Sequence, residues 1–94
     1  MPCEIDYIME YFVYILLSKK DNKFYTGFTS NLTDRILEHN SGKVISTRFR
    51  IPFELIYYES CFNKKDALHR EKYLKTTYGK RYIRNRLKNF LSMK

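Results

Sequence analysis

The C-terminal part of this chain combines cations with aromatic side chains. Residues 72–94 hold eight Lys and Arg and no acidic residue, and the rings of Tyr73, Tyr78, Tyr82 and Phe90 stand among them. Surfaces that bind nucleic acids often combine cations, which neutralise phosphates, with flat rings on which bases stack. The pattern therefore indicates contact with a polyanion; the alternative is an ordinary solvated basic surface that keeps the protein in solution.

Three other residues stand where a side chain could take part in chemistry. Arg35 and His39 are four positions apart in a segment expected to be helical, which places their side chains one turn apart on the same face. Glu71 falls within an apolar stripe that includes Leu68 and Leu74. A carboxylate in such a stripe breaks the local pattern. Breaks of this kind concentrate at functional sites, although an ion pair at the rim of the core would also produce one.

Length and composition favour one small globular domain. The chain has 94 residues, of which 44% are hydrophobic and 30% charged, and this composition argues against a disordered or low-complexity chain. The net charge is +8, and it is unevenly distributed, because residues 42–94 hold fourteen Lys and Arg against four Asp and Glu. A basic domain of this size favours nucleic acid as its partner.

The cysteines and the apolar runs exclude several classes of protein. Cys3 and Cys61 are far apart in the sequence, which argues against a disulfide framework and against a structural zinc site. The longest apolar run is too short to cross a membrane, and no leader pattern opens the chain. We therefore expect a cytoplasmic protein with no membrane partner, and we assume a monomer.

Short apolar runs rich in β-branched and aromatic residues predict three strands, over residues 11–17, 24–28 and 53–59. The polar turn between the first two predicts a hairpin. Capping residues mark the next element at both ends. Asn31, with Asp34 three residues later, is typical of a helix start, and Gly42 is typical of a helix stop. The apolar face of this first helix would consist of Leu32, Ile36 and Leu37.

Two more helices are expected in the second half. Asn63 with Asp66 repeats the capping pattern before a helix over residues 64–77. Gly79 interrupts the helical pattern, and the amphipathic spacing of residues 82–91 predicts a last helix.

The order of elements is β-β-α-β-α-α. It predicts an α+β fold in which a small three-stranded antiparallel sheet is flanked by three helices. We expect one domain over residues 11–92, after a loosely ordered tail of residues 1–10.

The sequence also resembles a known family. Val13-Tyr14-Ile15 followed by Tyr25-Thr26-Gly27 resembles the two tripeptides that name the GIY-YIG nucleases, with Val13 in place of the first Gly and Thr26 in place of the second Ile. Arg35 and His39-Asn40 resemble the first helix of that family, and residues 67–71 resemble its metal-binding helix. The likeness runs from Tyr11 to about Phe90 and is strongest to small stand-alone bacterial members, similar to the N-terminal domain of the excinuclease.

The resemblance implies metal-dependent hydrolysis of DNA phosphodiester bonds. On that basis the catalytic residues would be Tyr14, Tyr25, Arg35, His39 and Glu71. Tyr14 would be the general base and Tyr25 would orient it or the attacking water. Arg35 would hold a phosphate, His39 would relay a proton or hydrogen bond to the phosphate, and Glu71 would be the ligand of Mg²⁺ or Mn²⁺. Gly27 would leave the backbone bare where the phosphate approaches.

Further contacts to the DNA backbone are expected from the basic second half of the chain. The expected substrate-binding residues are Gly27, Lys43, Arg48, Arg50, Arg70, Lys75, Lys80, Arg81, Arg84, Asn85 and Arg86. Because contacts to phosphates position a substrate but do not read its sequence, we expect branched or damaged DNA as substrate, in repair or recombination. RNA is an alternative partner. A non-catalytic nucleic-acid-binding module and a domain that binds an acidic protein are alternative functions.

Overall fold

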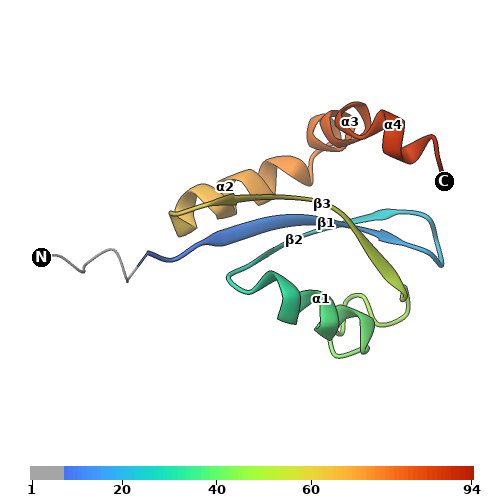
Figure 1. Cartoon of the computed structure of the whole chain (residues 1–94), viewed down its shortest axis with the longest axis horizontal. Helices are drawn as coiled ribbons and strands as arrows, with labels where there is room; N and C mark the ends of the chain where they lie inside the picture. The colour runs from blue at the N-terminus through green and yellow to red at the C-terminus, as the bar shows by residue number, and fades with distance from the viewer. Residues whose placement is uncertain (1–7) are drawn as a thin grey trace, which may run out of the picture.

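The computed structural model describes residues 8–94, which form a three-stranded sheet with helices on both faces (Figure 1). The strands are β1 (Tyr11–Ser18), β2 (Phe24–Thr29) and β3 (Phe53–Cys61). Their spatial order is β2-β1-β3, and both edge strands run antiparallel to β1. The helices are α1 (Leu32–Asn40), α2 (Lys64–Leu74), α3 (Thr77–Arg86) and the short α4 (Lys88–Leu91). The expected α+β class and antiparallel sheet are confirmed, with one more short helix than expected.

Strand β1 is apolar from Tyr11 to Leu17, which is typical of a central strand that is covered on both faces. Val13 and Ile15 point to one face, where they pack with Ala67 and Leu74 beneath α2 and α3. Tyr14 and Leu16 alternate with them, and they pack with Phe53 on the face that carries α1. The sheet therefore separates two small cores.

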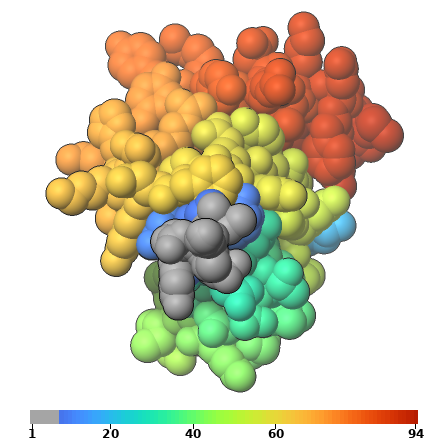
Figure 2. All heavy atoms as spheres, turned by 60° about the vertical axis from the view of Figure 1, so that its left-hand side comes forward, coloured from blue at the N-terminus to red at the C-terminus, as the bar shows by residue number. Residues whose placement is uncertain are grey.

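The two helical layers lie on opposite sides of the sheet. In Figure 2 the orange and red helices α2 to α4 gather on one side of the central strands, and α1 with the green loop after it lies on the other. Helix α2 also packs against the edge strand β2. Helix α2 therefore covers both β1 and β2 on its face of the sheet.

The α2–α3 boundary differs from the expectation. Helix α2 ends at Leu74, and Thr76 caps α3 by accepting a hydrogen bond from the backbone N–H of Gly79. Gly79, expected to interrupt the helical pattern, instead lies inside α3. A Cβ there would overlap the backbone of Tyr73 and Leu74, so glycine is needed for the close approach of α3 to the end of α2. The sequence pattern indicated that Gly79 matters locally, but it did not indicate the contact between α2 and α3 that requires a glycine.

Two expected core residues are exposed. Leu37 of α1 is 63% exposed and Leu68 of α2 is 40% exposed, because each lies on the flank of its helix rather than over the sheet. Of the expected tail, residues 1–7 lie outside the described part, and residues 8–10 are exposed and form neither helix nor strand. Within residues 8–94, no helix is long and apolar enough to cross a membrane.

Candidate active site

Tyr14 and Gly27 face each other across the β1–β2 ladder. The Tyr14 ring lies directly over Gly27, and a Cβ at that position would overlap the ring. Tyr14 is fully buried as a result. The glycine of the second tripeptide therefore gives the tyrosine of the first one room to cross the edge strand.

A chain of hydrogen bonds runs inward from the Tyr14 hydroxyl. Its oxygen lies 2.8 Å from Nε2 of His39, and Nδ1 of His39 lies 2.8 Å from Oγ1 of Thr47. Burial, with the nearby positive charge of Arg35, lowers the pKa of His39 to about 4, so the imidazole is neutral at pH 7. The arrangement fits a Tyr14 hydroxyl that donates to Nε2 and an Nδ1–H that donates to Thr47.

The charge of Arg35 lies at the outer end of this chain. Burial raises the pKa of Tyr14 to about 12, and the nearby guanidinium of Arg35 opposes that rise. Arg35 also donates from Nη1 to Oε1 of Glu38 at 3.0 Å, and its side chain is partly exposed. Arg35 thus connects the buried tyrosine with solvent, and its ion-pair partner is Glu38.

Tyr25 completes the cluster from the edge strand. Its ring centroid lies 5.0 Å from that of His39 and 6.4 Å from that of Tyr14. Phe53 packs against both Tyr25 and His39. Tyr25 is half-buried, so that one side of its ring belongs to the core and the other to the surface.

Glu71 reaches the same region from the opposite layer. It lies on α2, its side chain is 20% exposed, and its Oε2 lies 3.2 Å from Nζ of Lys75. The negative charge of Glu71 contributes to the raised pKa of Tyr14, which places the carboxylate within electrostatic range of the phenol. Glu71 and Tyr14 therefore lie within electrostatic range of each other although they belong to opposite layers.

The donors suit a weakly held hard cation. Among residues 8–94 there is no group of three or more His, Cys, Asp or Glu side chains able to share a metal ion. A single partly exposed carboxylate fits Mg²⁺ or Mn²⁺ that keeps most of its waters and takes further oxygens from a phosphate. It does not fit a permanently bound structural metal.

Asn40 fixes the end of α1 against β3. Its side chain accepts from the backbone N–H of Phe53 at 2.6 Å and donates to the backbone carbonyl of Phe53 at 3.0 Å. At the other end, Asn31 accepts from the backbone N–H of Asp34, as expected for a helix cap. With both ends held, His39 faces the sheet.

Two of the expected substrate-binding arginines have intramolecular roles. Arg50 pairs with Asp21 at 2.6 Å and ties the loop of residues 41–52 to the β1–β2 turn. Arg70 forms two hydrogen bonds to the Glu59 carboxylate and stacks over Tyr82. These cations are already neutralised by carboxylates. The expected residues that are exposed are Lys43, Arg48, Lys75, Lys80, Arg81, Arg84, Asn85 and Arg86.

Sequence reasoning missed the partner of His39. Thr47 is fully buried although it lies in a loop expected to be basic and exposed. The signal in the sequence for such a partner was His39 itself, because a buried imidazole needs hydrogen-bond partners for both of its nitrogens.

Comparison with known proteins decides the family. Residues 10–91 match the GIY-YIG catalytic domain. The chain belongs to the GIY-YIG family. The pairing of β1 with β2 brings the two tyrosines together, because Val13-Tyr14-Ile15 lies in β1 and Tyr25-Thr26-Gly27 lies in β2.

The relatives are small UPF0213 proteins of bacteria. A UPF0213 protein of Staphylococcus haemolyticus is 43% identical over 68 residues, which cover 71% of this chain and 82% of that protein. Another, of Pediococcus pentosaceus, is 36% identical over 91 residues and covers 96% of this chain and 95% of its own. The solution NMR structure of a UPF0213 protein of Bacillus halodurans matches with a TM-score of 0.51 and 36% identity, covering 80% of this chain and 82% of that one. The expected likeness to small stand-alone GIY-YIG proteins is confirmed, and the family indicates a nuclease.

Proposed function

We propose that this protein is a divalent-metal-dependent endonuclease that hydrolyses DNA phosphodiester bonds, directed by DNA structure or damage and acting in repair or recombination. The observation that carries the proposal is the clustering of Tyr14, Tyr25, His39 and Arg35 at the β2 edge, with Glu71 in electrostatic range. The family domain and the net charge of +8 support a nucleic acid as substrate.

The proton route uses the Tyr14–His39 pair. A free Tyr14 phenolate is rare at neutral pH because burial raises the pKa of the phenol. If Tyr14 passes its own proton to Nε2 of His39 while it accepts one from the attacking water, no free phenolate is required. His39 would hold that proton only briefly, because burial and Arg35 lower its pKa to about 4, and Thr47 holds the ring in the required tautomer.

Arg35 and Glu71 would hold the substrate and the metal. The guanidinium of Arg35 has the planar fork that matches two phosphate oxygens, and it would exchange Glu38 for the phosphate on binding. Glu71 would leave Lys75 to hold Mg²⁺ or Mn²⁺ through its carboxylate. The bound ion would supply Lewis acidity at the phosphoryl group and at the leaving oxygen.

The test is nicking of supercoiled plasmid, with Mg²⁺ or with EDTA. We expect wild type to nick only with Mg²⁺, and Arg35→Ala and Glu71→Gln each to lose roughly 100-fold or more in rate, since each removes transition-state charge stabilisation. Glu54→Gln is the matched control, because Glu54 pairs with Lys19 and Lys94 away from this region. Equal nicking by wild type and both variants would contradict the proposal. Cleavage of a labelled RNA, measured with Mg²⁺ and with EDTA, tests the alternative substrate.

A non-catalytic nucleic-acid-binding module is the second candidate. The ion pair between Glu71 and Lys75 favours it, because a lysine already neutralises the expected metal ligand. This candidate predicts salt-dependent DNA binding that Glu71→Gln leaves unchanged, with no nicking by any variant.

A further inference from the structure

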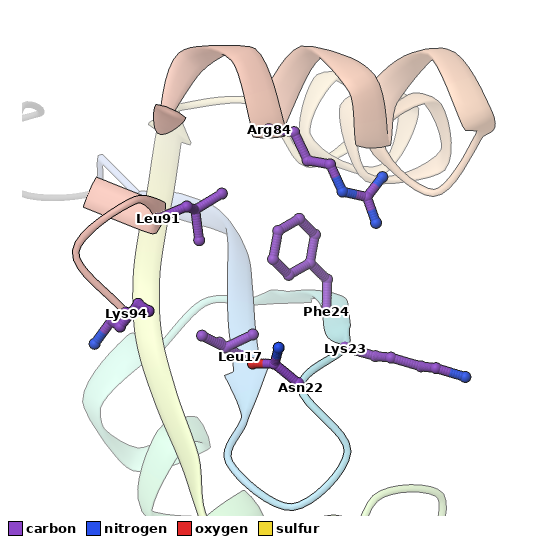
Figure 3. Close-up of a pocket in the computed structure, with 7 residues that line it drawn as sticks. All are labelled: Leu17, Asn22, Lys23, Phe24, Arg84, Leu91 and Lys94. Carbon is purple, nitrogen blue, oxygen red and sulfur yellow. The ribbon is translucent and has the colours of Figure 1, made fainter. Parts of the chain in front are cut away.

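A cleft lies on the other face of β2, at the end of the hairpin. It occupies about 230 Å³ between the β1–β2 turn and the C-terminal helices. Figure 3 shows the side chains of Leu17, Phe24 and Leu91 around a common space, with Arg84 extending from α3 toward the Phe24 ring. The cleft thus has an apolar floor and a polar rim.

Unpaired cations surround this floor. Arg84 lies over the Phe24 ring at 5.3 Å. A second hollow shares Lys23, Phe24 and Arg84 with the cleft and is also lined by Lys80. Among residues 8–94, none of Lys23, Lys80 and Arg84 forms an ion pair with a carboxylate. The acidic residue that lines the hollow, Asp21, is neutralised by Arg50, which holds the pKa of its carboxyl at about 2. Three cations without carboxylate partners that line one hollow favour phosphate.

The cleft and the candidate active site share one strand edge. Phe24 and Tyr25 are consecutive in β2, so their rings point to opposite faces, Phe24 to the cleft and Tyr25 to the Tyr14–His39 cluster. A nucleic acid strand that follows the β2 edge would therefore meet both.

We propose that this cleft binds one unpaired nucleotide of the substrate, with its base against Phe24 and its phosphate at Lys23, Lys80 and Arg84. The inference rests on the proposed function and adds the feature of DNA structure that the protein recognises. A paired base has its faces stacked within the duplex and cannot reach the apolar floor, so a duplex would contact only the cations of the rim. A short unpaired flap offers both groups.

The experiment measures equilibrium binding in EDTA, where no hydrolysis takes place. The probes are a fluorescent blunt duplex, a duplex of the same total length with an unpaired flap, and the same flap without bases. We expect wild type to bind the flapped duplex about tenfold more tightly than the blunt one, and the flap without bases to lose most of that preference. Equal affinity for all three probes would overturn the proposal.

Variants assign the preference to the cleft. We expect Arg84→Gln and Phe24→Leu to reduce the preference for the flap to twofold or less. Arg86→Gln is the matched control, because it removes one charge from the same helix outside the cleft and should weaken binding to all probes equally. If thermal melting shows that Phe24→Leu does not fold, Arg84→Gln still tests the proposal because Arg84 is exposed. An unchanged preference for the flap in Arg84→Gln contradicts the proposal.

This experiment is independent of hydrolysis. A protein that never nicks DNA but prefers the flap through Arg84 supports the cleft and contradicts the nuclease. A protein that nicks with Mg²⁺ but binds all three probes equally supports the nuclease and contradicts the cleft.

Discussion

The central residue of the site is a histidine that cannot easily take up a proton. His39 is fully buried and hydrogen bonded at both nitrogens, to Tyr14 and to Thr47. A buried imidazole flanked by the positive charge of Arg35 stays neutral, so its Nε2 keeps the lone pair that accepts the hydrogen bond of the Tyr14 hydroxyl. The cost of this arrangement is sensitivity to acid.

We predict that this histidine weakens the folded protein between pH 6.5 and about 4. Above pH 6.5 His39 is neutral in both states. Below it the unfolded chain binds a proton that the folded chain refuses until about pH 4, so the free energy of unfolding falls as the pH falls. The full loss is about 3 kcal/mol.

Urea denaturation of wild type and His39→Gln across this range measures the effect. The variant is expected to be less stable at pH 7 but to lose less stability on acidification, because other groups titrate equally in both proteins. Parallel pH profiles would show that His39 is not protected from protonation.

At the scale of elements, the site depends on how closely β1 and β2 approach. The Tyr14 ring occupies the space that any side chain at position 27 would need. Asn40 holds α1 from the other side through the Phe53 backbone. The position of the phenol is therefore set by a glycine and a helix clamp, not by the tyrosine alone.

Gly27→Ala should damage both stability and activity. The added methyl overlaps the Tyr14 ring, and we expect a loss of about 1–3 kcal/mol in the free energy of unfolding together with loss of plasmid nicking. A double-mutant cycle with Tyr14→Phe should show non-additive effects, since the two residues are in contact. Ser30→Ala, in the exposed turn after β2, is the control; full nicking by Gly27→Ala would contradict this account.

Several elements follow from local sequence signals. Asn31 and Asn63 cap α1 and α2 as expected, and the apolar run after Tyr11 forms a central strand because only a strand buried on both faces lacks polar alternation. The exposure of Leu37 and Leu68 could not be read in this way, because helical periodicity defines a face but not how the helix is rotated against its sheet. The role of Gly79 depends on a contact between two helices, which local signals do not contain.

Only part of the candidate site could be predicted from the sequence. The resemblance selected Tyr14, Tyr25, Arg35, His39 and Glu71, and the structure places the first four in one cluster. Thr47 was missed because its role depends on a buried contact with His39. Lys23 and Phe24 were missed because they come beside Lys80 and Arg84 only in the folded chain. The ion pairs of Arg50 and Arg70, which were expected to contact DNA, could not be predicted because their carboxylate partners lie on other elements.

At the scale of the whole molecule, the basic second half of the chain and the less basic first half supply different elements of the fold. The basic second half supplies α2, α3, α4 and the loop before β3, which lie on both sides of the sheet, while the first half supplies the hairpin and α1. A polyanion at the β2 edge would meet cations from both layers. Binding should then be dominated by phosphate contacts and weaken steeply with salt.

The salt dependence of DNA binding tests this picture. Arg81→Gln, on exposed α3, should reduce the slope of log affinity against log salt by about 1, because one phosphate contact is lost. Lys19→Gln removes an equal charge from a residue paired with Glu54 and should leave the slope unchanged. Equal slopes in all three proteins would show that α3 does not follow the backbone.

The central claim is that side chains from both layers form one metal-dependent hydrolytic site at the β2 edge. Its most direct test is the single-turnover rate of cleavage of a flapped DNA as a function of Mg²⁺ concentration, for wild type and Glu71→Gln. We predict a rate that rises with Mg²⁺ and saturates in wild type, and no Mg²⁺-dependent cleavage in the variant, whose amide cannot replace the carboxylate as ligand. Cleavage by wild type without metal, or the same Mg²⁺ dependence in both proteins, would contradict the claim.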